Sequence, residues 1–281
     1  MIDLIFGQNS VLIAGSALAA MVGAIEIGFR IGRRSDERVS KSAHAHIGAI
    51  QASLLGMLAL LLGFTLSLSL QRYDTRSEAV VDEANAIGTA WLRAQLLPGS
   101  VRGQVLEGMR RHVDLRVDAG EIDLAHPAER SRLLGQTNEN LNRLWGLALT
   151  AAEENPSPVT TGLYIQALNE MIDSHGQRGA ALNRHVPQTV LLLLFGTFLL
   201  TGSVVGYASG VAGHRPSATT HVLAVLIVVL AFVILDLDRP RRGLIRVDQS
   251  SLLDLQSAIH AAGKRADPAS LALPAQSPPR H

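Results

Sequence analysis

The sequence predicts an all-α, multi-pass membrane protein with four transmembrane helices and a helical extramembrane insert between the second and third of them. Three observations favour this class. The 281-residue chain has a mean hydropathy of +0.22, whereas a soluble domain of this length is normally net hydrophilic. Four apolar stretches approach the ~20 residues that a helix needs to cross a bilayer. The long polar segment between two of them has helical periodicity.

The four apolar stretches cover residues 10–29, 47–70, 189–211 and 221–237. The first contains one acid, Glu26, which stands four residues before Arg30, the favourable order for an ion pair along a helix. No Lys or Arg precedes Arg30, so the basic start of a signal peptide is missing. We therefore expect a retained membrane helix or an uncleaved signal anchor. The fourth stretch is the shortest, and its alternative is a buried helix of a soluble domain.

Small residues recur at every fourth position in these stretches. Gly202, Gly206 and Gly210 form a doubled G-x-x-x-G pattern in the third, and Gly15 and Gly23 stand eight residues apart in the first. Apolar burial gains little in lipid, so close backbone contact at such stripes favours helix association. We predict that these glycines pack helices together. The alternative is that glycine is simply common in membrane helices.

These features divide the chain into four parts. Residues 1–70 hold the first two transmembrane helices and a short basic loop, and residues 71–187 form the helical insert. Residues 188–238 hold the third and fourth transmembrane helices. Residues 239–281 form a C-terminal segment with a short helix at 251–262. The tail from residue 263 is rich in Pro, Ala and Ser, and we expect it to be mostly disordered.

Within the insert we expect helices over residues 73–94, 101–117, 128–153 and 160–185. Pro98-Gly99 and the run from Asn155 to Pro158 separate them. Each segment carries apolar residues at steps of three and four, which predicts the core of a helical bundle rather than a cofactor site. The stripes include Val80, Ala84, Ile87, Trp91, Val101, Val105, Met109, Val113, Leu134, Leu141, Leu144, Leu168, Met171, Ile172 and His175.

Charges near the membrane give two opposed predictions of orientation. The loop at 30–46 carries four arginines and Lys41, and the positive-inside rule places such a short loop in the cytoplasm, with the insert outside. Arginines also flank the opposite ends of the helices, among them Arg72, Arg76 and Arg184, and they favour the reverse orientation.

Composition and motifs exclude several classes of function. The formal net charge is +1, which gives no support to nucleic-acid binding, and the absence of cysteine excludes disulfides and thiolate metal sites. We find no phosphate-binding glycine loop, defensible Ser-His-Asp arrangement or zinc spacing. His44 and His46 stand two residues apart and have no third ligand. We therefore expect neither an enzyme nor a cofactor.

Two acidic groups are weak candidates for a metal site. Asp236 and Asp238 stand where the fourth helix leaves the membrane, but calcium needs six or more oxygens. We favour a helix terminator in which Asp238 pairs with an arginine. Asp82 and Glu83, with Asn85, could bind a cation. A solvated or subunit-contact face is the interpretation we favour for them.

One face of the second transmembrane helix is the best pore candidate. Gly56, Leu60, Phe64, Ser67 and Gln71 follow one another at steps of four and three. A ring of such faces would form an apolar constriction that opens into a vestibule lined by hydroxyl and amide groups. Apolar constrictions gate by dewetting, and these donors suit dehydrated anions. The alternative is a helix buried in a bundle, whose hydroxyls bond their own backbone.

The same stretch resembles a known family. Leu62-Gly63-Phe64, followed after seven residues by Arg72-Tyr73, is similar to the second membrane helix of bestrophins, which are pentameric anion channels with four membrane helices per chain. The resemblance implies that Phe64 is a pore-neck residue, with Leu60 and Gly56 as weaker matches, and that the insert is cytoplasmic. The sequence departs from that pattern at Asp74, where the family has a second aromatic residue.

A larger part of the chain, from about residue 47 to 255, is similar to a group of bacterial membrane proteins of unassigned activity that are described as bestrophin-like. The segments that carry this similarity are Glu83 to Gly88, Met171 to Asp173, Arg178, Val186-Pro187 and Asp236 to Gly243.

The function that we expect is an oligomeric anion channel or pore in the bacterial plasma (inner) membrane, lined by the second transmembrane helix. Its partners would be the lipid bilayer, further copies of the chain (a pentamer if it follows bestrophins) and a small anion, with no nucleic acid. The alternative is a non-conducting membrane scaffold or sensor whose helical insert binds a partner protein. The two differ in whether Phe64, Ser67 and Gln71 face a central water path or sibling helices of the chain.

Overall fold

A computed structural model describes residues 10–35, 41–122, 127–239 and 244–265 of the chain. They are helical apart from short connections, and the structure assigns no strand among them, which confirms the all-α class. The chain divides into two compact units. Residues 1–75 and 182–247 form one, called here the membrane unit, and residues 76–181 and 248–281 form the other, the bundle unit.

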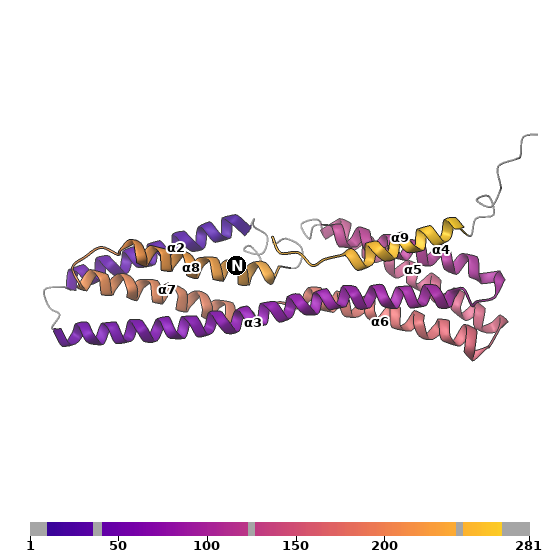
Figure 1. Cartoon of the computed structure of the whole chain (residues 1–281), viewed down its shortest axis with the longest axis horizontal. Coiled ribbons are helices and arrows are strands. Elements are labelled where there is room, and N and C mark those ends of the chain that lie inside the picture. Colours follow the sequence, from indigo (N-terminus) through magenta and orange to yellow (C-terminus); the bar gives the residue numbers. More distant parts are fainter. Residues whose placement is uncertain (1–9, 36–40, 123–126, 240–243, 266–281) are drawn as a thin grey trace, which may run out of the picture. The chain divides into compact units, whose positions relative to one another are not determined.

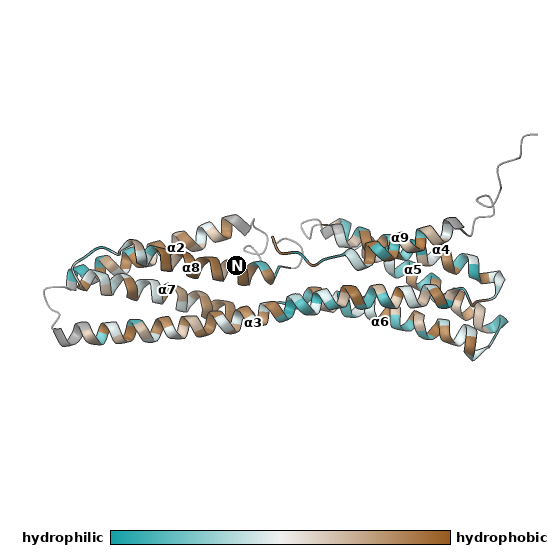
Figure 2. Ribbon diagram, in the orientation of Figure 1, coloured by the Kyte–Doolittle hydropathy of each residue, from teal (hydrophilic) through white to brown (hydrophobic). Residues whose placement is uncertain are grey.

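The membrane unit is built from α2 (Ser10–Ser35), the first part of α3 (Lys41–Ala94), α7 (Gln188–Val211) and α8 (Ala218–Leu237). Each of these helices contains a long run of apolar residues, and Figure 2 shows α8 as the most uniformly hydrophobic of them. Within the described residues, four stretches are long and apolar enough to cross a membrane: Leu12–Arg34, Ala45–Ala94, Pro158–Val211 and Ala218–Leu237. The apolar part of α3 ends near Leu70, and that of the third stretch lies in α7. The four predicted transmembrane helices are therefore present.

Helix α2 packs against α7 through glycines on both helices. A Cβ added at Gly206 would collide with the carbonyl oxygen of Ile25, and one added at Gly210 would collide with that of Phe29. The contact is reciprocal, because a Cβ at Gly28 would collide with the carbonyl oxygen of Ser203. The two backbones thus touch over several turns, a distance at which any side chain would separate them.

The predicted packing glycines fall into two groups. Gly202, Gly206 and Gly210 all face α2, whereas a Cβ at Gly15 or Gly23 would meet no atom of the chain within 4 Å. On α2 the α7 contact uses Gly28 and Gly32, which the sequence analysis did not select. Gly23 lies on a different face of α2, since it stands between Met21 and Ile25, which both contact α7. The spacing of Gly15 and Gly23 matched a packing stripe, but spacing alone does not say where two helices approach.

Side chains from all four helices fill the centre of the membrane unit. The cluster includes Met21 and Ile25 from α2, Phe198 from α7 and Ile234 from α8. Helix α3 contributes Leu58 and Leu62, which are 1% and 3% exposed. Only one side of α3 therefore packs against the rest of its own unit.

The bundle unit contains the second part of α3 with α4 (Gly99–Glu121), α5 (Pro127–Glu154), α6 (Leu163–Asn183) and α9 (Ser250–Arg265). A π-helical turn, η2 (Pro158–Gly162), precedes α6. Proline stands at or just before the start of α4, α5, η2 and α7, where its missing N–H costs no hydrogen bond. Figure 1 shows α6 lying along α3, and Arg93 and Arg76 of α3 both donate to α6 carbonyls.

The core of the bundle unit consists largely of the predicted stripes. Ile87, Met109, Leu144, Leu168 and Met171 are each 0% exposed. Complete burial of such a side chain is worth about 1.5–3 kcal/mol. In the predicted stripe of α5, Leu141 and Leu144 are buried, whereas Leu134 was wrong: it is 38% exposed, and its neighbour Leu133 is buried instead.

The C-terminal segment predicted from the sequence, residues 239–281, can be compared with the structure in part. Helix α9 belongs to the bundle unit, where it packs on α4, whereas the sequence assigned residues 239–281 to a separate segment. The predicted disordered tail from residue 263 lies mostly outside the described residues.

Gly206→Ala is expected to destabilise the membrane unit. Its new methyl group cannot avoid the Ile25 carbonyl oxygen unless α2 and α7 separate. Gly196→Ala on the same helix is the control, because nothing lies within 4 Å of its added Cβ. Alanine exceeds glycine in helix propensity by about 1 kcal/mol, so the control should be neutral or stabilising. Thermal unfolding in detergent, followed by circular dichroism, measures both. Equal midpoints for the two variants would contradict the close contact.

Candidate functional site

The predicted pore face of α3 is exposed along its whole length. Leu60 and Phe64 are 62% and 64% exposed, and Gly56, Ser67 and Gln71 are exposed as well. A Cβ at Gly56 would meet no atom within 4 Å. The structure therefore brings the five residues to one face of α3 that no other part of the described membrane unit covers.

The opposite face of α3 is held within the chain. Besides Leu58 and Leu62, it presents Thr65 and Ser69, which are 1% and 0% exposed. The Thr65 hydroxyl donates to the carbonyl of Leu61 at 2.6 Å, which satisfies it inside its own helix. A hydroxyl bonded to its own backbone, the alternative to a pore-lining hydroxyl, is thus found at Thr65, which lies on the buried face.

The two acids at the end of α8 bind backbone groups. Asp238 is 0% exposed and accepts from the Val186 N–H at 3.0 Å, while Asp236, 2% exposed, accepts from the Ile245 N–H at 2.9 Å. The His185 Nδ1 lies 3.5 Å from the second oxygen of Asp238. These bonds connect the end of α8 to the residue before Pro187 at the start of α7 and to the segment that follows α8.

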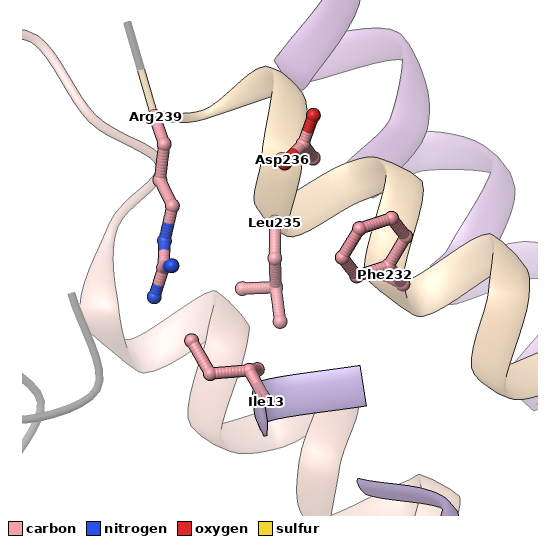
Figure 3. A pocket seen from close by; sticks show the side chains of 5 residues that line it. All are labelled: Ile13, Phe232, Leu235, Asp236 and Arg239. Carbon is pink, nitrogen blue, oxygen red and sulfur yellow. The ribbon is translucent and has the colours of Figure 1, made fainter. Parts of the chain in front are cut away.

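A small pocket lies beside these acids and is lined by Ile13, Phe232, Leu235, Asp236 and Arg239. The Arg239 side chain is 4% exposed and extends towards Ile13 (Figure 3). Among the described residues, no three His, Asp or Glu side chains come together as a metal site would require. Asp236 and Asp238 therefore stay weak metal candidates, with one oxygen of each already bound to a backbone N–H.

A buried cluster of charged side chains is the most prominent polar feature of the bundle unit. Glu83 of α3 is 0% exposed and accepts from Arg116 of α4 at 2.7 and 3.2 Å. Arg178 of α6 donates to the same carboxylate at 2.5 Å and to the Gln249 side chain, just before α9, at 2.6 Å. The His175 Nδ1 lies 3.4 Å from Glu83. One carboxylate thus joins groups from three helices, and Arg178 extends the network to a fourth segment.

This cluster corrects the prediction that Asp82 and Glu83 share a solvated or subunit-contact face. Asp82 and Asn85 are exposed, but Glu83 points into the bundle. The sequence did contain a signal, because Glu83 stands three residues after Val80 and four before Ile87, both on the buried stripe. Arg178 likewise stands seven residues after Met171.

The environment of Glu83 determines its charge. Burial alone would raise the pKa of its carboxyl group, but the neighbouring His175 imidazole and the guanidinium groups of Arg116 and Arg178 together lower that pKa well below its usual range. Burial also lowers the pKa of Arg178, and Glu83 opposes that effect. Glu83 is therefore ionised at neutral pH and is the counter-ion of two guanidinium groups.

His112 lies against the same cluster and is 0% exposed. Its ring centroid is 6.3 Å from that of His175, and neither of its ring nitrogens has a hydrogen-bond partner in the described structure. Burial, with the Arg116 guanidinium nearby, lowers the pKa of His112 from 6.5 to about 3. The imidazole is therefore neutral at physiological pH.

The predicted pair at the end of the first apolar stretch is present. The Arg30 Nε donates to Glu26 Oε1 at 2.8 Å, and both side chains are substantially exposed. A pair of this kind is worth little in stability, typically ~0.3–0.5 kcal/mol on a helix.

Comparison with known proteins identifies relatives by sequence and by fold. A sequence model of the Bestrophin-like domain matches residues 19–252. Two variants of a bacterial bestrophin homologue from Klebsiella pneumoniae match the structure at 17% identity each. The match to the first variant has a TM-score of 0.61 and covers 91% of this chain and 99% of the variant's chain. The match to the second has a TM-score of 0.62 and covers 89% of this chain and 97% of the variant's chain. A crystal structure of a membrane protein variant matches at 18% identity, with a TM-score of 0.61. No curated protein sequence matches the chain.

Glu83→Gln is expected to lower the free energy of unfolding of the bundle unit by about 3–5 kcal/mol. It leaves two buried guanidinium groups without their counter-charge, which is the costly way to break a buried ion pair. Asp82→Asn, at the exposed neighbouring position, should change stability by no more than about 0.5 kcal/mol. Denaturant unfolding in detergent compares the two, and similar losses would contradict the role of Glu83.

Acidification should destabilise the protein through His112. The folded-state pKa of about 3 is below the unfolded value of 6.5, so between these values the unfolded chain binds the extra proton. The contribution of His112 to the free energy of unfolding is fully present above pH 6.5. It decreases as the pH is lowered, by about 2 kcal/mol at pH 5. Glu83 acts with the same sign, but only below its ordinary pKa of 4.5.

His112→Gln should flatten the dependence of the unfolding midpoint on pH between 7 and 5, because glutamine does not titrate. His214→Gln, at an exposed position, is the control and should keep the slope of the unsubstituted protein. A slope that His112→Gln leaves unchanged would mean that other groups cause it.

Proposed function

Because this chain belongs to the bestrophin-like family, we propose that it forms an oligomeric ion channel whose pore is lined by α3. The observation that carries the proposal is the one-sided packing of α3. Its Leu58 and Leu62 face is buried, while Leu60 and Phe64 on the other side are more than 60% exposed. A helix that packs within its own chain on one face can line a pore shared by several copies with its opposite face.

The proposed path has an apolar neck and a polar mouth. Phe64 and Leu60 would form the constriction, where a narrow apolar ring excludes water and closes the pore by dewetting. Ser67 and Gln71 follow one and two turns later and offer hydroxyl and amide donors. Such donors replace part of the hydration shell of an anion, so a small anion is the proposed permeant ion.

A ring of α3 faces requires several copies of the chain around one axis. Such a ring uses head-to-tail contacts that close, and five copies are proposed by resemblance to bestrophins. Exposed glycines on α3 and α2, among them Gly56 and Gly15, would let helices of neighbouring copies approach closely.

The proposed site of action is the bacterial plasma (inner) membrane, which α2, α3, α7 and α8 would each cross once. The proposal involves no catalytic step and no cofactor.

A second candidate function is a non-conducting scaffold or sensor whose helical bundle binds a partner protein. It is favoured by exposed apolar side chains on the bundle unit: Leu92, Leu96 and Val159 are 66%, 49% and 69% exposed. Exposed apolar side chains of this size suit contact with another protein.

Chloride flux into liposomes that contain the purified protein tests the channel. Phe64→Ala should increase the flux, because a smaller apolar ring is easier to wet, while the oligomer in detergent stays the same size. Leu226→Ala on α8 is the matched control, since Leu226 is 63% exposed on a different helix and its loss should leave flux unchanged.

The outcomes separate the candidates. No chloride or cation flux from a folded oligomer, over a range of calcium concentrations and pH, would reject the channel and favour the scaffold. Loss of assembly in Phe64→Ala would assign that residue to packing. Cation flux in place of chloride would reject the anion and point to Asp74 and Glu78, exposed carboxylates on the next two turns of α3.

A further inference from the structure

Arginines gather at the end of the membrane unit where α2 and α7 finish. Arg33 and Arg34 lie in the last turn of α2 and are exposed. Arg215, also exposed, lies in the connection between α7 and α8, with its guanidinium carbon 6.0 Å from the centre of the Phe29 ring. Because Arg33 follows Phe29 by one helical turn, Arg215 lies beside the α2 arginines.

The backbone builds this arrangement. Helix α7 ends in a Schellman motif, in which His214 N–H donates to the Ser209 carbonyl at 3.3 Å and Gly213 N–H to the Gly210 carbonyl at 3.1 Å. Gly213 has a φ of 75°, which glycine adopts without strain, and the turn directs the chain back towards α2. At Gly210 an added Cβ would lie 2.7 Å from the Arg33 backbone nitrogen, so the last turns of the two helices are in contact.

These three positive charges are not neutralised within the described part of the chain. The nearby acid Glu26 pairs with Arg30, and no described carboxylate forms an ion pair with Arg33, Arg34 or Arg215. Like charges held side by side repel, and an anion between them removes that repulsion. The position also selects the anion, because the apolar stretch of α2 ends at Phe29 and the arginines therefore stand at the level of lipid headgroups.

We propose that Arg33, Arg34 and Arg215 form a binding site for the phosphate headgroup of an anionic phospholipid. A guanidinium group forms paired hydrogen bonds with phosphate oxygens, which suits this ligand better than a point charge would. In the bound state the aliphatic parts of the arginine side chains would lie along the apolar surface while their charged ends reach the headgroup. The site is independent of ion conduction.

Native mass spectrometry of the full chain in detergent tests the site, with dioleoylphosphatidylglycerol titrated against dioleoylphosphatidylcholine. The unsubstituted protein should bind the anionic lipid more tightly. The triple variant R33Q/R34Q/R215Q should weaken that binding by up to about 100-fold, since each basic residue near a membrane surface contributes roughly fivefold. R33K/R34K/R215K keeps the charge and should retain most of the preference.

The matched control is R102Q/R111Q/R143Q, which removes three exposed arginines from the bundle unit and should leave lipid binding unchanged. Equal thermal midpoints of the variants in phosphatidylcholine show that folding is intact, and the double variant R33Q/R34Q serves the test if the triple glutamine variant does not fold. The proposal would be overturned if the folded glutamine variant of the site bound the anionic lipid as tightly as the unsubstituted protein. It would also be overturned if the control variant lost as much binding as the site variant, or if inorganic phosphate raised the midpoint as much as the lipid does.

Discussion

The buried ion pairing of Glu83 with Arg116 and Arg178 is the interaction on which the bundle unit depends most. The Glu83 carboxylate lies on α3, and its oxygens receive guanidinium groups from α4 and α6, one of which also holds Gln249 before α9. Charges buried in this way are tolerated only when every partner is in place, so the cluster specifies which helices pack together more than it adds net stability. The apolar stripes around it, with Ile87, Met109 and Met171, provide the burial.

The membrane unit is held by a different kind of contact. Between α2 and α7 the backbones themselves touch, because glycine leaves no side chain between Gly206 and the Ile25 carbonyl or between Gly28 and Ser203. In lipid this close packing replaces the hydrophobic driving force that stabilises the bundle. Helix α3 takes no part in these backbone contacts and packs through the side chains of its inner face, among them Leu58 and Leu62. Its outer face is left for water, lipid or another copy of the chain.

Sequence patterns predicted the helices well because hydropathy and periodicity depend on residues close together in the chain. Gly202, Gly206 and Gly210 were found in this way, since a regular spacing on one helix is visible locally. Their partners Gly28 and Gly32 were missed, although they also stand four residues apart, because Gly32 lies beyond the apolar stretch that was predicted to end at residue 29. The burial of Glu83 was missed although its place between Val80 and Ile87 on the buried stripe indicated it, whereas its ionic contacts could not be predicted locally. Its partners Arg116 and Arg178 are 33 and 95 residues away, and no local pattern pairs them.

The glycine contact between α2 and α7 also has a consequence for biosynthesis. Gly28 and the carbonyl of Ser203 that it meets are separated in the chain by residues 76–181, the larger part of the bundle unit. At a translation rate of ~5–20 residues per second, roughly 9 to 35 seconds pass between the synthesis of one and the other. During that interval the nascent α2 exposes a strip of bare backbone to whatever surrounds it at the insertion site. The first transmembrane helix therefore needs a temporary neighbour, lipid or insertion machinery, that yields its place when α7 arrives.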